Sequence, residues 1–359
     1  MFPSAIQTAE IDVPCTNLAA LLDFFTTQAG FRVDLIFPAD APTTAVISGY
    51  GVRLRLITAP PSSPLRLVFY VDAAQWPNFA PHELKGPDDV IIALVDAEPK
   101  ITIPAGTQEW IFSRNDDIDA WGTGRAGMQY RDLIPGRLGG RFVASHIRIS
   151  AGGEVPDYVH FHRVRFQMIY CKAGWVRVVY EDQGEPFVMH AGDCVLQPPQ
   201  IRHRVLAASA GLEVIEVGCP AIHDTVADHA LVLPNAVVNA DREFGGQYFV
   251  RHIAADAQWS RGGKSDFDKR DLGIASATSG LARARVLSAS RNLDLKRDAH
   301  RGELLFYVVL SGQLALTKMS STEHRREHRL GAGDSVVVPA GVVYALAAQF
   351  GTELLEVSI

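Results

Sequence analysis

The chain has 359 residues, of which 47% are hydrophobic and 21% are charged, and its formal net charge is −6. This length predicts about two to three globular domains, and the acidic balance argues against nucleic acid or an anionic membrane surface as a partner. The chain contains no apolar run of 18 residues, and its first residues lack the basic and apolar regions of a signal peptide. Its four cysteines form no CxxC pair. We therefore expect a cytoplasmic protein whose cysteines are small core residues.

The first predicted elements, between Ile6 and Thr58, are a strand, a helix and three further strands. Alternating apolar residues predict the first strand around Ile11. An i, i+3, i+4, i+7 apolar repeat predicts a helix from Leu18 to Phe25, capped by Thr16 or Asn17 and ended by Gly30. The later strands are predicted at Phe31–Ile36, Thr44–Ser48 and Gly51–Leu56.

This βαβββ order, with the wording LDFFTTQAGFRVDLIFP…ISGYGVRLRL, resembles one module of the vicinal-oxygen-chelate (glyoxalase and extradiol dioxygenase) superfamily. Metal-binding members usually have His or Glu in the first and fourth strands. The side chains near those positions here are Glu10 or Asp12, and Arg53 or Arg55, and a cation repels a metal ion. The resemblance implies a small α+β domain, at residues 1–115, with a metal-free structural or substrate-shaping role.

The second segment, residues 116–235, contains a pair of histidines separated by one residue. His160 and His162 lie two residues apart in a strand-like stretch, and such side chains point to the same face of a strand. His203 follows a second strand-like run and its Pro198-Pro199 corner. Short strands separated by Gly-containing turns predict a β-sandwich or barrel here. Three imidazoles that converge predict a metal site.

This spacing resembles the two motifs of the cupin superfamily, G(X)5HXH(X)3–4E(X)6G and G(X)5PXG(X)2H(X)3N. The matching positions are His160, His162, Gly174, Gly192, Pro198 and His203. The departures are Gln167 in place of the usual Glu, Gly153 seven residues before His160, Gln200 in place of Gly, and Ala207 in place of the closing Asn. The resemblance implies that His160, His162, Gln167 and His203 hold one divalent metal inside a jelly-roll barrel.

Imidazole nitrogen suits Fe, Ni, Cu and Zn. We take Fe as the first expectation, with Ni, Zn, Mn or Cu as the other candidates. Because Gln167 is neutral, the ion keeps its full charge and attracts anions. One unit charge at about 4 Å is worth roughly 4 kcal/mol at an effective dielectric near 20. Gln167 and Tyr158 are the predicted catalytic residues. Tyr158 shares strand parity with the two histidines, so it is either a hydrogen-bond donor at the site or an aromatic residue at the barrel rim.

The third segment, residues 236–359, repeats the strand pattern, and Gly333, Pro339 and Gly341 match the second cupin motif. Its ligand positions differ. Counting back from Gly312 places Leu305 at the carboxylate position, and leucine cannot bind a metal. We expect a degenerate second barrel in which Asp298, His300, Glu303 and Tyr344 form a metal-free polar pocket, or in which the loop residues among them, His300 and Glu303, lie at the surface.

The predicted fold is therefore mainly β, with two tandem cupin-type barrels after a small α+β domain, which resembles the bicupins. Two function classes remain open. One is a metal-dependent dioxygenase acting on a small anionic or enolisable substrate, such as a diketone or a dihydroxyaromatic compound. The other is an isomerase or lyase, or a small-molecule-binding bicupin without activity. The sequence leaves the oligomeric state open, and a homodimer is one of the alternatives.

Overall fold

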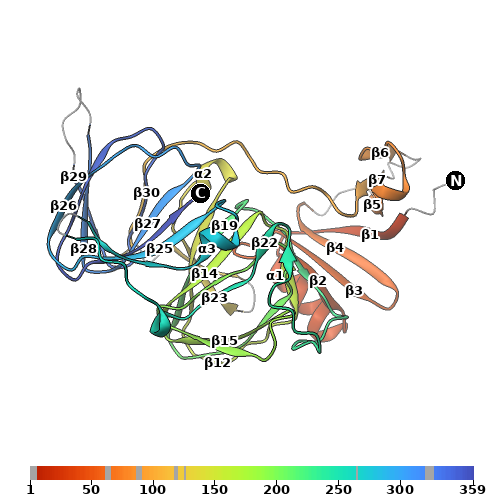
Figure 1. The fold of residues 1–359 in the computed structure, drawn as a ribbon. Coiled ribbons are helices and arrows are strands. Elements are labelled where there is room, and N and C mark those ends of the chain that lie inside the picture. Colours follow the sequence, from red (N-terminus) through yellow and green to blue (C-terminus); the bar gives the residue numbers. More distant parts are fainter. Residues whose placement is uncertain are drawn as a thin grey trace. The chain divides into compact units, whose positions relative to one another are not determined.

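The computed structural model describes residues 6–60, 66–85, 91–116, 120–124, 127–263, 266–319 and 327–359 (Figure 1). The chain divides into two compact units. The first comprises Met1–Thr102, Tyr158–Arg163 and His223–Leu231, and the second comprises Ile103–Asp157, Val164–Ile222 and Val232–Ile359.

The first unit is one sheet with a helix. Its strands are β1 Ile6–Cys15, β2 Arg32–Phe37, β3 Thr44–Gly49, β4 Val52–Thr58, β5 Arg66–Val71, β6 His82–Lys85, β7 Ile91–Asp96, β13 His160–His162 and β20 Thr225–Ala227, and its helices are α1 Leu18–Asp23, a π-helical turn Phe24–Gln28 and a 3₁₀ turn Ala73–Gln75. The strand order in space is β6-β7-β5-β1-β4-β3-β2-β20-β13. The predicted βαβββ order is thus present as β1, α1, β2, β3 and β4.

Local sequence explains helix α1. The side chain of Asn17 accepts a hydrogen bond from Ala20 N at 3.0 Å, so Asn17 is the cap, and Gly30 has the left-handed φ of +70° expected after a helix. The helix packs its Leu18 and Leu21 on one face of the sheet, together with Leu54 and Leu56 of β4. The alternate residues of β4 therefore point to the opposite face, which is polar.

The second unit contains the remaining strands. The first group is β8 Ile111–Ser113, β9 Trp121–Thr123, β10 Gln129–Asp132, β11 Val143–Ile149, β12 Gly153–Glu154, β14 Phe166–Ala173, β15 Trp175–Tyr180, β16 Phe187–His190, β17 Cys194–Leu196, β18 His203–Ala208 and β19 Leu212–Cys219. The second group is β21 Glu243–Phe244, β22 Gln247–Tyr248, β23 Val250–His252, β24 Asp268–Asp271, β25 Arg283–Ser288, β26 Leu293–Arg297, β27 Leu305–Ser311, β28 Gln313–Lys318, β29 Glu327–Gly331, β30 Ser335–Val337, β31 Tyr344–Ala348 and β32 Glu353–Ser358. Its short helical segments are α2 Arg137–Gly140, a 3₁₀ turn Ala254–Asp256 and α3 Ile274–Ala277.

These strands build two tandem barrels. The first barrel has the sheet β23-β17-β14-β19-β11-β10-β9 and the strands β16-β15-β18, with β12 on β18. The second barrel has the sheets β24-β25-β32-β27-β30-β8 and β26-β31-β28-β29. The tandem jelly-roll architecture implied by the cupin resemblance is therefore confirmed.

Two short strands pair with strands on the far side of a predicted domain boundary, after residue 115 or after residue 235. Strand β8, which precedes the first barrel in sequence, pairs with β30 of the second barrel. Strand β23, which precedes the second barrel, pairs with β17 of the first. Each barrel therefore takes one edge strand from the segment before the other barrel, and the two barrels are structurally interdependent.

A shared apolar core joins the two barrels. It includes Phe166, Met168 and Val217 of the first barrel and Phe306 and Val308 of the second, all at most 1% exposed. These residues lie on the outer faces of their barrels, because the alternate positions of the same strands fill separate barrel interiors. The duplicated barrels thus bury one sheet against the other.

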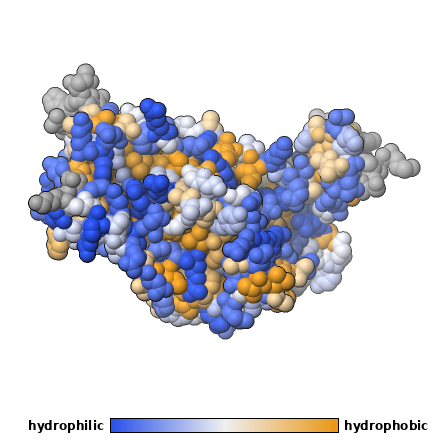
Figure 2. Space-filling model, in the orientation of Figure 1, coloured by the Kyte–Doolittle hydropathy of each residue, from blue (hydrophilic) through white to orange (hydrophobic). Residues whose placement is uncertain are grey.

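All four cysteines are buried free thiols. Cys171 is fully buried in the core of the first barrel, as predicted, and this burial raises the pKa of its thiol to about 12. In the part of the chain that the structure describes, no helix is long and apolar enough to cross a membrane. The face shown in Figure 2 is mainly hydrophilic, with scattered apolar patches.

Candidate metal centre

His160 and His162 come from the short strand β13, and both are almost fully buried. Their ring centroids are 5.2 Å apart. The Nδ1 atom of His160 lies 2.8 Å from the carbonyl oxygen of Tyr158, and Nδ1 of His162 lies 3.0 Å from the hydroxyl of Thr225 on the paired strand β20. A backbone carbonyl only accepts, so His160 carries its proton on Nδ1. Its Nε2 atom is then the ring nitrogen that carries the lone pair a metal requires.

His203 is the first residue of β18 and is oriented in the same manner. Its Nδ1 atom lies 3.0 Å from the carbonyl oxygen of Ile201, which again places the proton on Nδ1. The ring of Tyr180 stacks on the imidazole with centroids 5.4 Å apart. Burial raises the pKa of the Tyr180 phenol, so this ring stays neutral beside the histidine.

The structure brings these three histidines together. Among the residues that it describes, His160, His162 and His203 form the one group of His, Cys, Asp or Glu side chains whose ligand atoms all lie within 4.8 Å of one another. Metal-binding histidines usually donate their second ring N–H to an oxygen atom, and His160 and His203 do so here. The donor set of three imidazoles therefore fits a divalent transition metal.

Gln167 lies on β14 and is 2% exposed. It shares its strand face with Cys171, which belongs to the interior core of the first barrel. Its Nε2 atom donates to Oε1 of Glu216 on the neighbouring strand β19 at 2.6 Å. Because the amide nitrogen is used in this way, Oε1 is the atom of Gln167 that remains suited to a metal.

Glu216 was not among the predicted site residues. It interrupts the apolar run Leu212–Cys219 at a position that shares its strand face with Val214, which faces the barrel interior. The sequence signal for Glu216 was an acidic residue at an inward-facing position of an otherwise apolar strand. The first barrel therefore contains an acidic group, Glu216. Because Gln167 stands where the motif usually has Glu, the sequence predicted a site without a carboxylate.

Tyr158 precedes the strand instead of lying in it, because β13 begins at His160. Its carbonyl oxygen orients His160, while its half-buried ring packs edge-on at 6.0 Å from the His160 ring and also contacts His229. The ring of His223 lies 5.4 Å from that of His162. No motif spacing pointed to His223 or Thr225.

The four residues predicted to share a pocket in the second barrel have different surroundings. The hydroxyl of Tyr344 pairs with that of Tyr307 at 2.9 Å in the buried interior, whereas His300 Nε2 lies 2.9 Å from the carbonyl oxygen of Val338. Glu303 forms ion pairs with Arg141 and Arg165 at 2.7 and 2.9 Å, and Asp298 is exposed. Although burial alone would raise it, these guanidinium groups hold the pKa of Glu303 below its usual value.

Comparison with known proteins agrees with the duplicated barrel. Residues 145–218 and 292–358 each match the family model described as a cupin domain. No curated protein matches the sequence. The oxalate decarboxylase of Bacillus subtilis at pH 4.6 is 12% identical with a TM-score of 0.51, covering 73% of this chain and 78% of that chain. A further structure of that enzyme, described by its Mn(II) centres, is 13% identical with a TM-score of 0.50, covering 73% and 80%. Protein Ylba from E. coli is 14% identical with a TM-score of 0.45, covering 72% and 93%.

At these identities the similarity to solved structures concerns the fold alone. The chain thus contains two regions that match the cupin domain, one in each of its tandem barrels. His160 and His162 of β13 and His203 of β18 form the group that defines a candidate metal centre.

Proposed function

We propose that the first barrel is the active site of a metal-dependent oxidoreductase of the dioxygenase type. The proposed substrate is a small anionic or enolisable molecule, either a diketone or a dihydroxyaromatic compound. The observation that carries the proposal is the set of three buried histidines whose ligand atoms lie within 4.8 Å of one another, each with Nδ1 near an oxygen atom. Three neutral ligands leave the positive charge of an ion available to a substrate oxyanion.

The proposed cofactor is one divalent transition metal per chain, with Fe as the first expectation and Ni, Zn, Mn or Cu as the other candidates. When bound, such an ion supplies Lewis acidity and open positions for substrate and dioxygen. His160, His162 and His203 would hold it, with Oε1 of Gln167 as the proposed fourth ligand.

Tyr158 and Gln167 are the proposed catalytic residues. The hydrogen bond from Gln167 to Glu216 uses the amide nitrogen, so the amide oxygen of Gln167 is the atom proposed to bind the metal. Tyr158, packed edge-on against His160, is the proposed hydrogen-bond donor to the substrate. Burial of the histidines limits the access of water and strengthens electrostatic contacts with a bound anion.

Oxygen consumption tests the oxidative reaction. The purified protein, reconstituted separately with Fe(II), Mn(II), Ni(II), Zn(II) or Cu(II), would be incubated with β-diketones and dihydroxyaromatic compounds in an oxygen-electrode cell. We expect oxygen uptake with at least one pair of metal and substrate, and loss of that uptake in a His160→Ala, His162→Ala variant. Full uptake by that variant would contradict the proposal.

The alternative is an isomerase or lyase, or a binding protein without activity. Glu216 supports the non-oxidative enzyme, because a carboxylate beside Gln167 is a group that can accept a substrate proton. Substrate conversion under nitrogen, with no dependence on oxygen, would favour this alternative. Metal-dependent binding of a substrate without conversion would favour a binding protein.

We also propose that the first unit is a metal-free module of the vicinal-oxygen-chelate type. The order β1, α1, β2, β3, β4 supports it, as does the ion pairing of Glu10 with Arg53 and Arg55, which occupies the side chains near the usual ligand positions. Metal titration of the His160→Ala, His162→Ala variant is the test, and we expect no tightly bound ion. Stoichiometric metal retained by that variant and lost in Glu10→Gln would overturn the proposal.

A further inference from the structure

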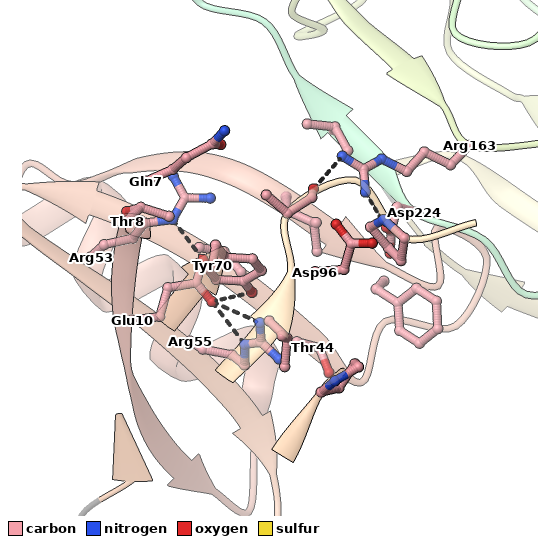
Figure 3. A pocket seen from close by; sticks show the side chains of 18 residues that line it. Gln7, Thr8, Glu10, Thr44, Arg53, Arg55, Tyr70, Asp96, Arg163 and Asp224 are labelled. Atoms are coloured by element: carbon pink, nitrogen blue, oxygen red, sulfur yellow. Dashed lines mark hydrogen bonds and ion pairs between the residues drawn. The ribbon is translucent and has the colours of Figure 1, made fainter. Parts of the chain in front are cut away.

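The first unit contains a cavity of about 570 Å³ on the polar side of its sheet (Figure 3). This volume is typical of sites for small organic ligands. Apolar side chains, including those of Leu35, Val46 and Val95, form part of its wall. Val95 lies on the strand face opposite to its core neighbour Leu94, so its side chain borders the cavity and not the apolar core.

Two arginines of β4 converge on one buried carboxylate in this cavity. Glu10 is 1% exposed, and its Oε1 atom accepts from Nε of Arg53 at 2.6 Å. Its Oε2 atom accepts from Nε of Arg55 at 2.9 Å and from the Tyr70 hydroxyl at 2.8 Å. Figure 3 shows the three donors arranged around Glu10. Because both guanidinium groups are planar and anchored through Nε, their remaining N–H groups have fixed directions.

Both arginines retain donors that are available to a ligand. Asp34 accepts from Nη1 of Arg53 at 2.8 Å, and Nη2 of Arg55 lies 2.8 Å from Glu10. Within the described ranges, Nη2 of Arg53 and Nη1 of Arg55 take no protein partner. The two side chains line the cavity and are 33% and 28% exposed. Such N–H groups bind carboxylates through strong charge-assisted hydrogen bonds.

The other charged groups of the wall are engaged by the chain itself. Asp96 accepts from the backbone N of Glu98 at 2.9 Å, and Asp224 lies 4.0 Å from Nη1 of Arg163. A second amino group of Arg163 lies 3.4 Å from the carbonyl oxygen of Ala97. Among the charged groups of the wall, Arg53 and Arg55 therefore offer N–H donors to a ligand, next to apolar side chains.

We propose that this cavity is a second ligand site, independent of the metal centre, for a small organic carboxylate with an apolar body. The carboxylate accepts from the free N–H groups of Arg53 and Arg55, and the apolar body packs against Val46 and Val95. Glu10 does not touch the ligand, but it holds both guanidinium groups in position.

Benzoate is the probe, since it combines one carboxylate with a rigid apolar ring. Binding to the full chain would be followed by isothermal titration calorimetry and ligand-observed NMR, with and without a chelator in the buffer. We expect benzoate to bind at least tenfold more tightly than neutral benzamide, and chelation to leave its affinity unchanged. Loss of binding on chelation would place benzoate at the metal centre and overturn the proposal, without bearing on the proposed dioxygenase reaction.

Variants locate the site. Arg55→Gln should raise the Kd for benzoate at least tenfold, whereas Arg66→Gln should leave it within twofold of the wild type. Arg66 is a matched control, because it is 33% exposed, bonds Asp12 and Glu83 on the same sheet, and does not line the cavity. Val95→Phe fills the cavity without removing a charge, so it should abolish binding even if Arg55→Gln impairs folding. Equal affinities in the wild type and Val95→Phe, or no preference for benzoate over benzamide, would overturn the proposal.

Discussion

The side-chain amide of Gln167 donates to the carboxylate of Glu216 across strands β14 and β19, with 2.6 Å between Nε2 and Oε1. A neutral residue at the position where related motifs have Glu is therefore paired with an acid on the adjacent strand. The first barrel therefore has a carboxyl group one strand away from the amide of Gln167. This pairing makes the two side chains a unit in any substitution experiment.

Reversing the pair should tighten metal binding. In Gln167→Glu, Glu216→Gln the hydrogen bond is kept with its direction reversed, and a carboxylate replaces the amide as the proposed metal ligand. We expect the metal affinity to rise at least tenfold in competition with a metallochromic chelator, because an anionic oxygen is the stronger ligand. The binding of a simple diketonate should weaken, since the carboxylate cancels one unit of positive charge.

The single variant Gln167→Glu is the control for that experiment. It places two carboxylates within hydrogen-bond distance, so repulsion should make its gain in metal affinity smaller than that of the double variant. Equal metal affinity in the wild type and both variants would show that Gln167 is not a ligand.

The metal content should be about one ion per chain. Elemental analysis after reconstitution tests this, and His160→Ala, His162→Ala should remove the ion because it deletes two of three nitrogen ligands. His190→Ala, which changes an exposed histidine of β16 in the same barrel, is the matched control and should retain full occupancy. Two tightly held ions per chain would be inconsistent with the single group of histidines.

The apolar core shared by the barrels should control the stability of both. Phe306 lies in this core and is fully buried, so Phe306→Ala should lower the free energy of unfolding by about 3–5 kcal/mol. Phe350→Ala, at a residue that is 74% exposed, should change it by less than about 0.5 kcal/mol. Urea unfolding followed by Trp fluorescence gives both values. A similar loss in the two variants would argue against a cooperative barrel pair.

Asp266 should contribute stability that depends on pH. Burial opposes ionisation, but hydrogen bonds from Lys269 and Arg297 outweigh it and lower the pKa of Asp266 from 3.8 to about 2. Because the folded pKa lies below the unfolded one, the contribution is present above about pH 4 and is lost as the pH falls towards 2. Asp266→Asn should therefore destabilise the protein by about 1–2 kcal/mol at pH 6.

That difference between the wild type and Asp266→Asn should shrink between pH 4 and pH 3, as measured by chemical unfolding. The exposed Asp294→Asn on strand β26 of the same barrel is the control. A stability difference that stays constant down to pH 3 would show that the ion pairs of Asp266 do not stabilise the fold.

Short-range spacing was sufficient to predict the histidine pair and its strand. The separation of His160 and His162 defines one strand face through the two-residue period, and the oxygen atoms that orient His160 and His203 come from residues only two positions earlier. The helix capped by Asn17 and ended near Gly30 is equally local. The cupin motifs carried the remaining information, because their spacing relates His203 to the pair.

Tertiary structure decided the features that depend on contacts between distant residues. Glu216 lies 49 positions from Gln167, and strand register brings them together, which no local period specifies. Register likewise directs Arg53 and Arg55 towards Glu10, residues that the sequence presented only as unsuited to a metal. In the second barrel, Glu303 pairs with Arg141 and Arg165 from the segment of the first barrel, partners that its local sequence does not specify. Local periods determine which face a side chain takes, whereas the pairing of strands far apart in sequence determines which side chains meet there.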